Sequence, residues 1–192
     1  MVREGAELRA SSRRGFLRAA GAAASGGVVL AGCGSGKGLH ARVKRLGPVA
    51  RPDVETLNRL LDLEYWAIAA YTAGIPLLAP SAVPAARQFL QQELAHAGEL
   101  SGLVKQAGGK ARKPAPSYDL GHPMRSREVL SLLHRIERSQ LAAYLEAIPR
   151  LQPARVRAAA AAILANDAQH VSILRLELGL SPLPAALVGR AE

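Results

Sequence analysis

The chain has few of the residues that disulfide frameworks and β-sheets require. Its 192 residues include one cysteine, Cys33, which has no partner for a disulfide within the chain. Aromatic residues make up 4% of the sequence, with one Trp, whereas Ala and Leu are abundant, and this composition favours helix over sheet. No run of about 18 strongly apolar residues occurs, which argues against a membrane-spanning helix in the mature protein. We therefore predict an all-α domain preceded by a segment with a separate role.

Negative charge is missing from the start of the chain, and this explains the formal net charge of +10. Residues 1–32 contain five Arg and two Glu, and residues 33–52 contain five Lys or Arg and no acid. The remaining residues, 53–192, carry 15 basic and 13 acidic side chains and are nearly neutral. No nucleic-acid motif, nucleophilic triad or glycine-rich phosphate loop is present. We therefore expect no nucleic-acid partner.

The N-terminal residues 1–32 resemble an export signal. Arg13 and Arg14 precede the mildly apolar run Ala19–Gly32, as in twin-arginine signals, and the run ends in Leu-Ala-Gly before Cys33, as in a bacterial lipoprotein cleavage site. The expected partners are the twin-arginine translocase and lipoprotein processing enzymes. Lipidation of Cys33 would supply the two or more acyl chains that stable membrane anchoring needs. The alternative is an ordinary amphipathic or disordered N-terminus.

These signals predict where the protein resides. A lipidated Cys33 would place it on the extracytoplasmic face of the bacterial cell membrane, and the protein would be secreted if the lipoprotein site is not used. Residues 33–52 are rich in Gly and basic residues and read as a flexible tether. We expect the folded domain at 53–180 and a C-terminal tail at 181–192.

Apolar residues at helical spacing predict four helices. The first begins with Asp53 as its N-cap and runs to Pro76, and the second stops near Gly108. The third runs from Ser126 to Pro149, and the fourth from about Pro153 to Gly179. Short connections at 76–82 and 150–152 predict two antiparallel hairpins. Residues 107–124 lack periodicity and are long enough to cross a bundle end to end, so we predict a four-helix bundle with one long crossover.

The two hairpins repeat one pattern of polar residues. Each has a Glu in its first helix and, about thirty residues later, an acid followed three positions on by a His. The members are Glu64 with Glu93 and His96, and Glu137 with Asp167 and His170. Acid and His at i, i+3 lie on the same helical face and can reach one metal ion. A third match, Asp119 with His122, falls in the crossover and is attributed to chance.

All six residues fall on the apolar stripes of their helices; Glu64, for example, lies between Leu61 and Ile68. Buried charges are costly unless they are paired or bind a metal. Four carboxylates face at most two positive imidazoles, and no Lys or Arg shares the stripes, so the cluster would repel itself without cations. We predict a dinuclear metal site. Buried salt bridges and satisfied core histidines are the alternative.

These residues and the hairpin repeat resemble the ferritin-like superfamily, in particular exported ferritin-like proteins related to desiccation-associated proteins, over Asp53–Gly179. The resemblance implies that all six residues bind two iron ions, or alternatively manganese. Asp167 departs from the family's usual Glu and is one methylene shorter, so the second ion could be held more weakly. Tyr71 and Tyr144, each seven residues after a Glu of the pattern, could hydrogen-bond the ligands, but core packing is the favoured reading.

By resemblance, the expected activity is oxidation that depends on O2 or peroxide, such as Fe(II) oxidation or removal of oxidants by a di-iron oxidoreductase. Manganese catalase-like dismutation is a variant of the same class. The competing hypothesis is a non-enzymatic structural or stress-protective envelope protein with a partial or absent metal site. The sequence leaves the choice between enzyme and non-enzyme open, and it does not predict an oligomeric state.

Overall fold

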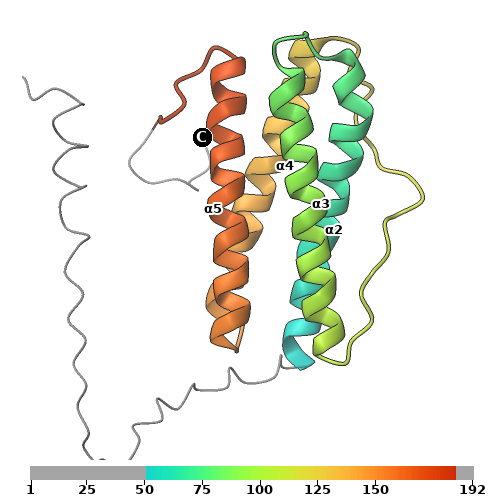
Figure 1. The fold of residues 1–192 in the computed structure, drawn as a ribbon, viewed down its shortest axis with the longest axis vertical. Coiled ribbons are helices and arrows are strands. Elements are labelled where there is room, and N and C mark those ends of the chain that lie inside the picture. Colours follow the sequence, from blue (N-terminus) through green and yellow to red (C-terminus); the bar gives the residue numbers. More distant parts are fainter. Residues whose placement is uncertain (1–50, 185–192) are drawn as a thin grey trace, which may run out of the picture. The chain divides into compact units, whose positions relative to one another are not determined.

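The computed structural model describes residues 51–184, and this part of the chain consists of helices and their connections without any strand. Its elements are α2 (Arg51–Gly74), η1 (Ile75–Leu77), α3 (Val83–Gln106), α4 (Ser126–Ala147), η2 (Ile148–Arg150) and α5 (Ala154–Glu177). Figure 1 shows the four α-helices standing side by side. The predicted all-α four-helix bundle is confirmed. The predictions for Arg13, Arg14 and Cys33 lie outside the described residues.

Proline and glycine set most of the helix ends. Pro76 and Pro149 each follow the last α-helical residues of α2 and α4, where the chain tightens into a 3-10 turn. Gly108 and Gly179 have φ angles of 71° and 75°, a left-handed conformation that suits glycine. There the amide of the residue after each glycine bonds a carbonyl five residues back, which closes α3 and α5 with Schellman motifs.

The prediction that Asp53 caps the first helix was wrong. Helix α2 begins two residues earlier, at Arg51, and Asp53 lies within its first turn. Its buried carboxylate instead accepts a hydrogen bond of 3.2 Å from the backbone amide of Gln152, in the connection between α4 and α5. The tertiary partner therefore replaces the local one, and the acid joins the two hairpins at one end of the bundle.

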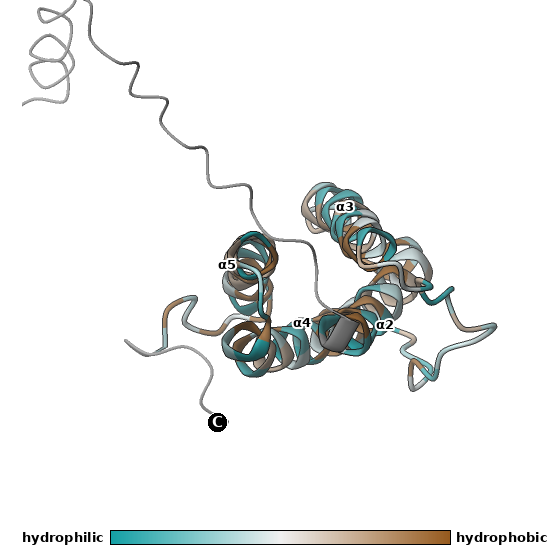
Figure 2. Ribbon diagram, turned by 90° about the horizontal axis from the view of Figure 1, so that it is seen from below, coloured by the Kyte–Doolittle hydropathy of each residue, from teal (hydrophilic) through white to brown (hydrophobic). Residues whose placement is uncertain are grey.

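The helices do not pack equally against one another. Helix α2 packs against both α3 and α4, and α4 packs against α5, whereas α3 and α5 share fewer contacts than any of these pairs. Seen along the bundle in Figure 2, α2 and α4 lie next to each other and α3 and α5 flank them. None of the described helices is both long enough and apolar enough to span a membrane. We call the sparse contact between α3 and α5 the α3/α5 seam.

The apolar core is divided into two clusters. One contains Leu57, Leu61, Leu100, Val156 and Ile163 among its members, and the other is built from residues such as Phe89, Val129, Leu133, Ile136 and Leu174. Along each helix, a buried acid (Glu64, Glu93, Glu137 or Asp167) falls between the members of one cluster and those of the other. A polar layer in the middle of a bundle needs internal partners, because water does not reach it.

The crossover between α3 and α4 is fixed to α2 by polar contacts. Asn58, only 4% exposed, donates a hydrogen bond of 3.1 Å to the carbonyl of Lys110 and accepts one of 2.9 Å from the amide of Arg112. The Arg112 guanidinium forms ion pairs with Asp62 and Glu55. A segment without periodicity thus gains a defined path along the outside of α2.

We expect Asn58→Ala to destabilise the fold by about 1–3 kcal/mol, because it leaves two partly buried backbone groups of the crossover without partners. Urea unfolding measures the loss, and limited proteolysis should show faster cleavage near Lys110. The matched control is Arg112→Ala, whose exposed ion pairs contribute about 0–1 kcal/mol. Equal stability losses in the two variants would contradict the anchoring role of Asn58.

Candidate metal centre

The six residues of the repeated pattern meet in the middle of the bundle. Their ligand atoms form two groups, within each of which all atoms lie within 4.8 Å of one another. The larger group consists of Glu93, Glu137, Asp167 and His170, all buried, and the smaller of Glu64, His96 and Asp167. Asp167 belongs to both groups and is the only residue that does. Its shorter side chain therefore still reaches both halves of the site.

Both histidines direct the same ring nitrogen toward the carboxylates. Nδ1 of His170 lies 3.2 Å from an oxygen of Glu93 and 3.2 Å from one of Glu137. Nδ1 of His96 lies 3.3 Å from Asp167 and 3.5 Å from Glu64. Each Nδ1 faces carboxylates from other helices. His170 belongs to one ligand group and His96 to the other, so each half of the site has one imidazole.

The donor set fits divalent metal ions. Several atoms of the site are buried and have no hydrogen-bond partner: Glu93 Oε1, His96 Nδ1, Glu137 Oε2 and both carboxylate oxygens of Asp167. Unpartnered buried acceptors are rare in folded proteins, because each costs the desolvation of a polar group. Carboxylate oxygens with imidazole nitrogens are ligands that iron and manganese accept. Cations placed among these atoms would satisfy them together.

The electrostatics also show a site that lacks positive charge. Burial, followed by the charge of neighbouring carboxylates, raises the pKa of Asp167 to about 9. Burial likewise raises the pKa of Glu137 to about 7 and that of Glu64 well above its ordinary value. Burial alone would lower the pKa of His170, but hydrogen bonds and charge from Glu137 and Glu93 raise it to about 9. Without metal, protons take the place of cations.

Two residues of the site, Glu93 and His96, have pKa values below their ordinary ones. Burial would raise the pKa of Glu93, yet hydrogen bonds from His170, Glu64 and Gln140 hold it below its ordinary value. Burial lowers the pKa of His96, and its neighbours only partly offset this. The two histidines are therefore unequal: without metal, His170 keeps its proton and His96 releases it readily.

Tyr71 and Tyr144 do more than pack in the core, which was the reading that their sequence favoured. Both are fully buried. Tyr71 donates a hydrogen bond of 2.6 Å to Glu137, and Tyr144 donates one of 2.5 Å to Glu64. Each tyrosine thus bonds the acid of the opposite hairpin and holds one carboxylate oxygen in a fixed position.

We expect Tyr144→Phe to destabilise the protein by about 1–2 kcal/mol and to weaken metal binding, because Glu64 loses the donor that orients it. Thermal unfolding and metal titration of the same sample measure both effects. Tyr65→Phe is the matched control, since its hydroxyl makes only an exposed bond of 3.3 Å to the crossover. Unchanged metal affinity in Tyr144→Phe would show that the hydroxyl does not orient Glu64.

Sequence reasoning missed three carboxamides around the site. Gln140 is fully buried, and its Nε2 donates to Glu64 at 3.1 Å and to Glu93 at 2.9 Å. Gln92 accepts a hydrogen bond of 2.8 Å from Nε2 of His170, and Asn166 lies beside His96 and raises its pKa against the effect of burial. Gln140 had a visible signal, because it lies on the same buried stripe as Glu137, one turn later.

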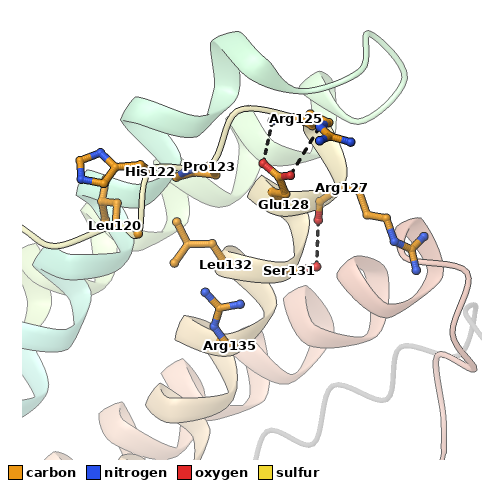
Figure 3. A pocket seen from close by; sticks show the side chains of 10 residues that line it. Leu120, His122, Pro123, Arg125, Arg127, Glu128, Ser131, Leu132 and Arg135 are labelled. Atoms are coloured by element: carbon orange, nitrogen blue, oxygen red, sulfur yellow. Dashed lines mark hydrogen bonds and ion pairs between the residues drawn. The ribbon is translucent and has the colours of Figure 1, made fainter.

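Other polar features lie outside this centre. Asp119 and His122 are exposed in the crossover and belong to neither ligand group. A surface pocket of about 450 Å³ lies between the crossover and the start of α4, and none of the six site residues lines it. Figure 3 shows that the guanidinium groups of Arg125, Arg127 and Arg135 point in different directions there. They do not converge on one ligand position.

Comparisons with known proteins agree with this geometry. A family model described as "Ferritin-like domain" matches residues 52–180. Among solved structures, a conserved hypothetical protein from Mycobacterium tuberculosis is similar with a TM-score of 0.64 and 21% identity, covering 70% of this chain and 96% of that one. A ferritin-like, diiron-carboxylate protein from Bacillus anthracis str. Ames has a TM-score of 0.59 and 20% identity, covering 65% and 94%. No curated protein matches the sequence.

Proposed function

Because the chain belongs to the ferritin-like domain family, we propose that it binds two iron ions, or alternatively manganese, and oxidises Fe(II) or removes oxidants at this centre. The observation that carries the proposal is the set of carboxylate and imidazole atoms that converge from four helices, several of them buried without a hydrogen-bond partner. When bound, a pair of Fe(II) ions would supply two electrons, which with two protons convert O2 to hydrogen peroxide.

The residues around the ions have distinct roles in this proposal. Asp167 is shared by the two positions, while His170 and His96 each serve one of them. Tyr71 and Tyr144 hold Glu137 and Glu64 through their hydroxyl groups. The protons held by Asp167 and by Nδ1 of His170 leave when metal binds, so that binding releases protons. The two apolar clusters exclude water from the layer between them.

The two metal positions are unequal. The position with His170 has four buried ligands, whereas the one with His96 has three, and the His96 side chain is 11% exposed. The first is expected to fill first, and the second is the more open position for an oxidant or for exchange. We also propose that the protein works outside the cytoplasm as a lipoprotein anchored at Cys33, and the order of the export and lipidation motifs supports this.

Anaerobic loading of the full chain with Fe(II) tests the proposal. Two irons per chain, followed by O2 consumption and formation of Fe(III), are expected. His96→Ala should lose one iron and His170→Ala at least one, both without unfolding, whereas the exposed His122→Ala keeps both. Substoichiometric iron and no O2 consumption would overturn the oxidase proposal and leave a structural or stress-protective envelope protein with a partial or absent site.

A further inference from the structure

The α3/α5 seam is bridged beside the metal centre by a polar contact between the hairpins. Oε1 of Gln92, on α3, lies 2.8 Å from Nε2 of His170, on α5. Since α3 and α5 share fewer contacts than the pairs α2/α3, α2/α4 and α4/α5, this bond joins two helices that otherwise have little contact. It also engages the ring nitrogen that does not face the carboxylates, because Nδ1 of His170 faces Glu93 and Glu137.

Asn166 occupies the position in the second hairpin that Gln92 occupies in the first. Gln92 immediately precedes Glu93, and Asn166 immediately precedes Asp167. Each carboxamide approaches the histidine of the other hairpin, since Asn166 lies beside His96. The second pairing is looser: Oδ1 of Asn166 is buried without a hydrogen-bond partner. Both residues of the Asn-Asp pair are one methylene shorter than those of the Gln-Glu pair.

The ring of His170 is held on two sides by one helix. Phe89 stacks on it with a centroid distance of 4.0 Å and an interplanar angle of 26°. Gln92, three residues after Phe89 on α3, accepts a hydrogen bond from Nε2 at the edge of the His170 ring. His96 is more exposed and has the shorter Asn166 beside it.

We propose that Gln92 and Asn166 are positioning residues that orient the two histidine ligands from across the α3/α5 seam, and that their different lengths make the His170 metal position tighter than the His96 position. This inference rests on the proposed metal function. Because Oε1 of Gln92 can only accept, Nε2 of His170 carries the hydrogen, and its Nδ1 lone pair is left for the metal. Mutation of a residue that hydrogen-bonds a metal-binding histidine typically lowers metal affinity 10- to 100-fold.

The test exchanges the two side-chain lengths in the full chain and uses Mn²⁺ alone as the probe. Gln92→Asn should weaken the tighter of the two Mn²⁺ dissociation constants by about 10-fold or more, and Asn166→Gln should strengthen the weaker one. Electron paramagnetic resonance of free Mn²⁺ gives both constants without any turnover. Gln91→Asn is the matched control, since this exposed neighbour changes length in the same way.

A second readout separates positioning from general stability. In the Zn²⁺-loaded protein, the Nε2 hydrogen of His170 should exchange with water slowly, and Gln92→Leu should speed this exchange while Gln91→Asn leaves it unchanged. If wild type binds two Mn²⁺ and neither Gln92→Asn nor Asn166→Gln changes the dissociation constants, this inference alone would be overturned. Wild type that binds no Mn²⁺ would overturn the proposed function as well.

Discussion

Asp167→Asn should abolish the binding of both metal ions while leaving the protein folded. Asp167 is the only residue that belongs to both ligand groups, so its loss removes a charge and an oxygen ligand from each position. Asparagine has nearly the same shape, and both oxygens of Asp167 lack hydrogen-bond partners, so no existing bond is broken. Mn²⁺ titration of the full chain should fall from two ions to fewer than one.

The same substitution should stabilise the metal-free protein at pH 7. Burial raises the pKa of Asp167 to about 9, so the folded protein must keep a proton that the unfolded chain has released. Asparagine is neutral in both states and avoids this cost, a gain on the order of 4 kcal/mol. Loss of metal binding combined with a higher melting temperature would identify a residue kept for its ligand role.

Two control variants make this result specific. Asp167→Glu restores the longer side chain and should keep two ions. Asp119→Asn makes the same chemical change in the acid-x-x-His match of the crossover, which is exposed and belongs to neither ligand group. It should alter neither metal binding nor stability. Two tightly bound ions in Asp167→Asn would show that the shared position is not a bridge between the metals.

The metal-free protein should lose stability as the pH rises from 6.5 to 9, whereas the metal-loaded protein should not. His170 has its pKa raised from 6.5 to about 9, so the stability it contributes is present below 6.5 and is lost through 9. Asp167, whose pKa is raised to about 9, must remain protonated, and this cost grows over the same range. The two effects have the same sign. Glu93 and His96, whose pKa values are lowered, titrate below this window.

Thermal unfolding at several pH values measures this dependence. We expect a loss on the order of 6 kcal/mol, about half of it from each group, or roughly 20 °C, in the metal-free protein between pH 6.5 and 9. The increase in melting temperature caused by Mn²⁺ under anaerobic conditions should grow by a similar amount, since the ions then replace the protons. Asp167→Asn should flatten the slope. A slope equal to wild type in that variant would show that other groups cause it.

The fold was predictable because local signals and the repeat agreed. Prolines at 76 and 149 and glycines at 108 and 179 mark helix ends in both the sequence and the structure. The unequal connections give two hairpins, and the matched offsets of Glu64 and Glu137 place their helices in register. The acids and histidines could be found because charged residues on apolar stripes conflict with burial. Their meeting in one layer follows from the same stripes.

The hydrogen-bond partners of buried polar residues could not be predicted from the sequence. Asp53 has the sequence signal of an N-cap, but its carboxylate bonds Gln152, 99 residues away in the chain. The bonds of Gln92 and Gln140 depend on how far one helix is shifted along another, which helical periodicity alone does not determine. Glutamine is also common on solvent-exposed helix faces, so Gln92 carries no local signal that separates it from its exposed neighbour Gln91.

The crossed bonds of Tyr71 and Tyr144 have a consequence for the origin of the repeat. Neither tyrosine bonds the acid of its own hairpin, because each reaches the Glu of the other half. This is the arrangement expected if two identical hairpins, related by a two-fold axis through the carboxylate cluster, had been joined by gene fusion. In such a homodimer every one of these bonds would have been intermolecular. The shortened Asn166 and Asp167 would then be changes that only a fused chain could acquire in one half.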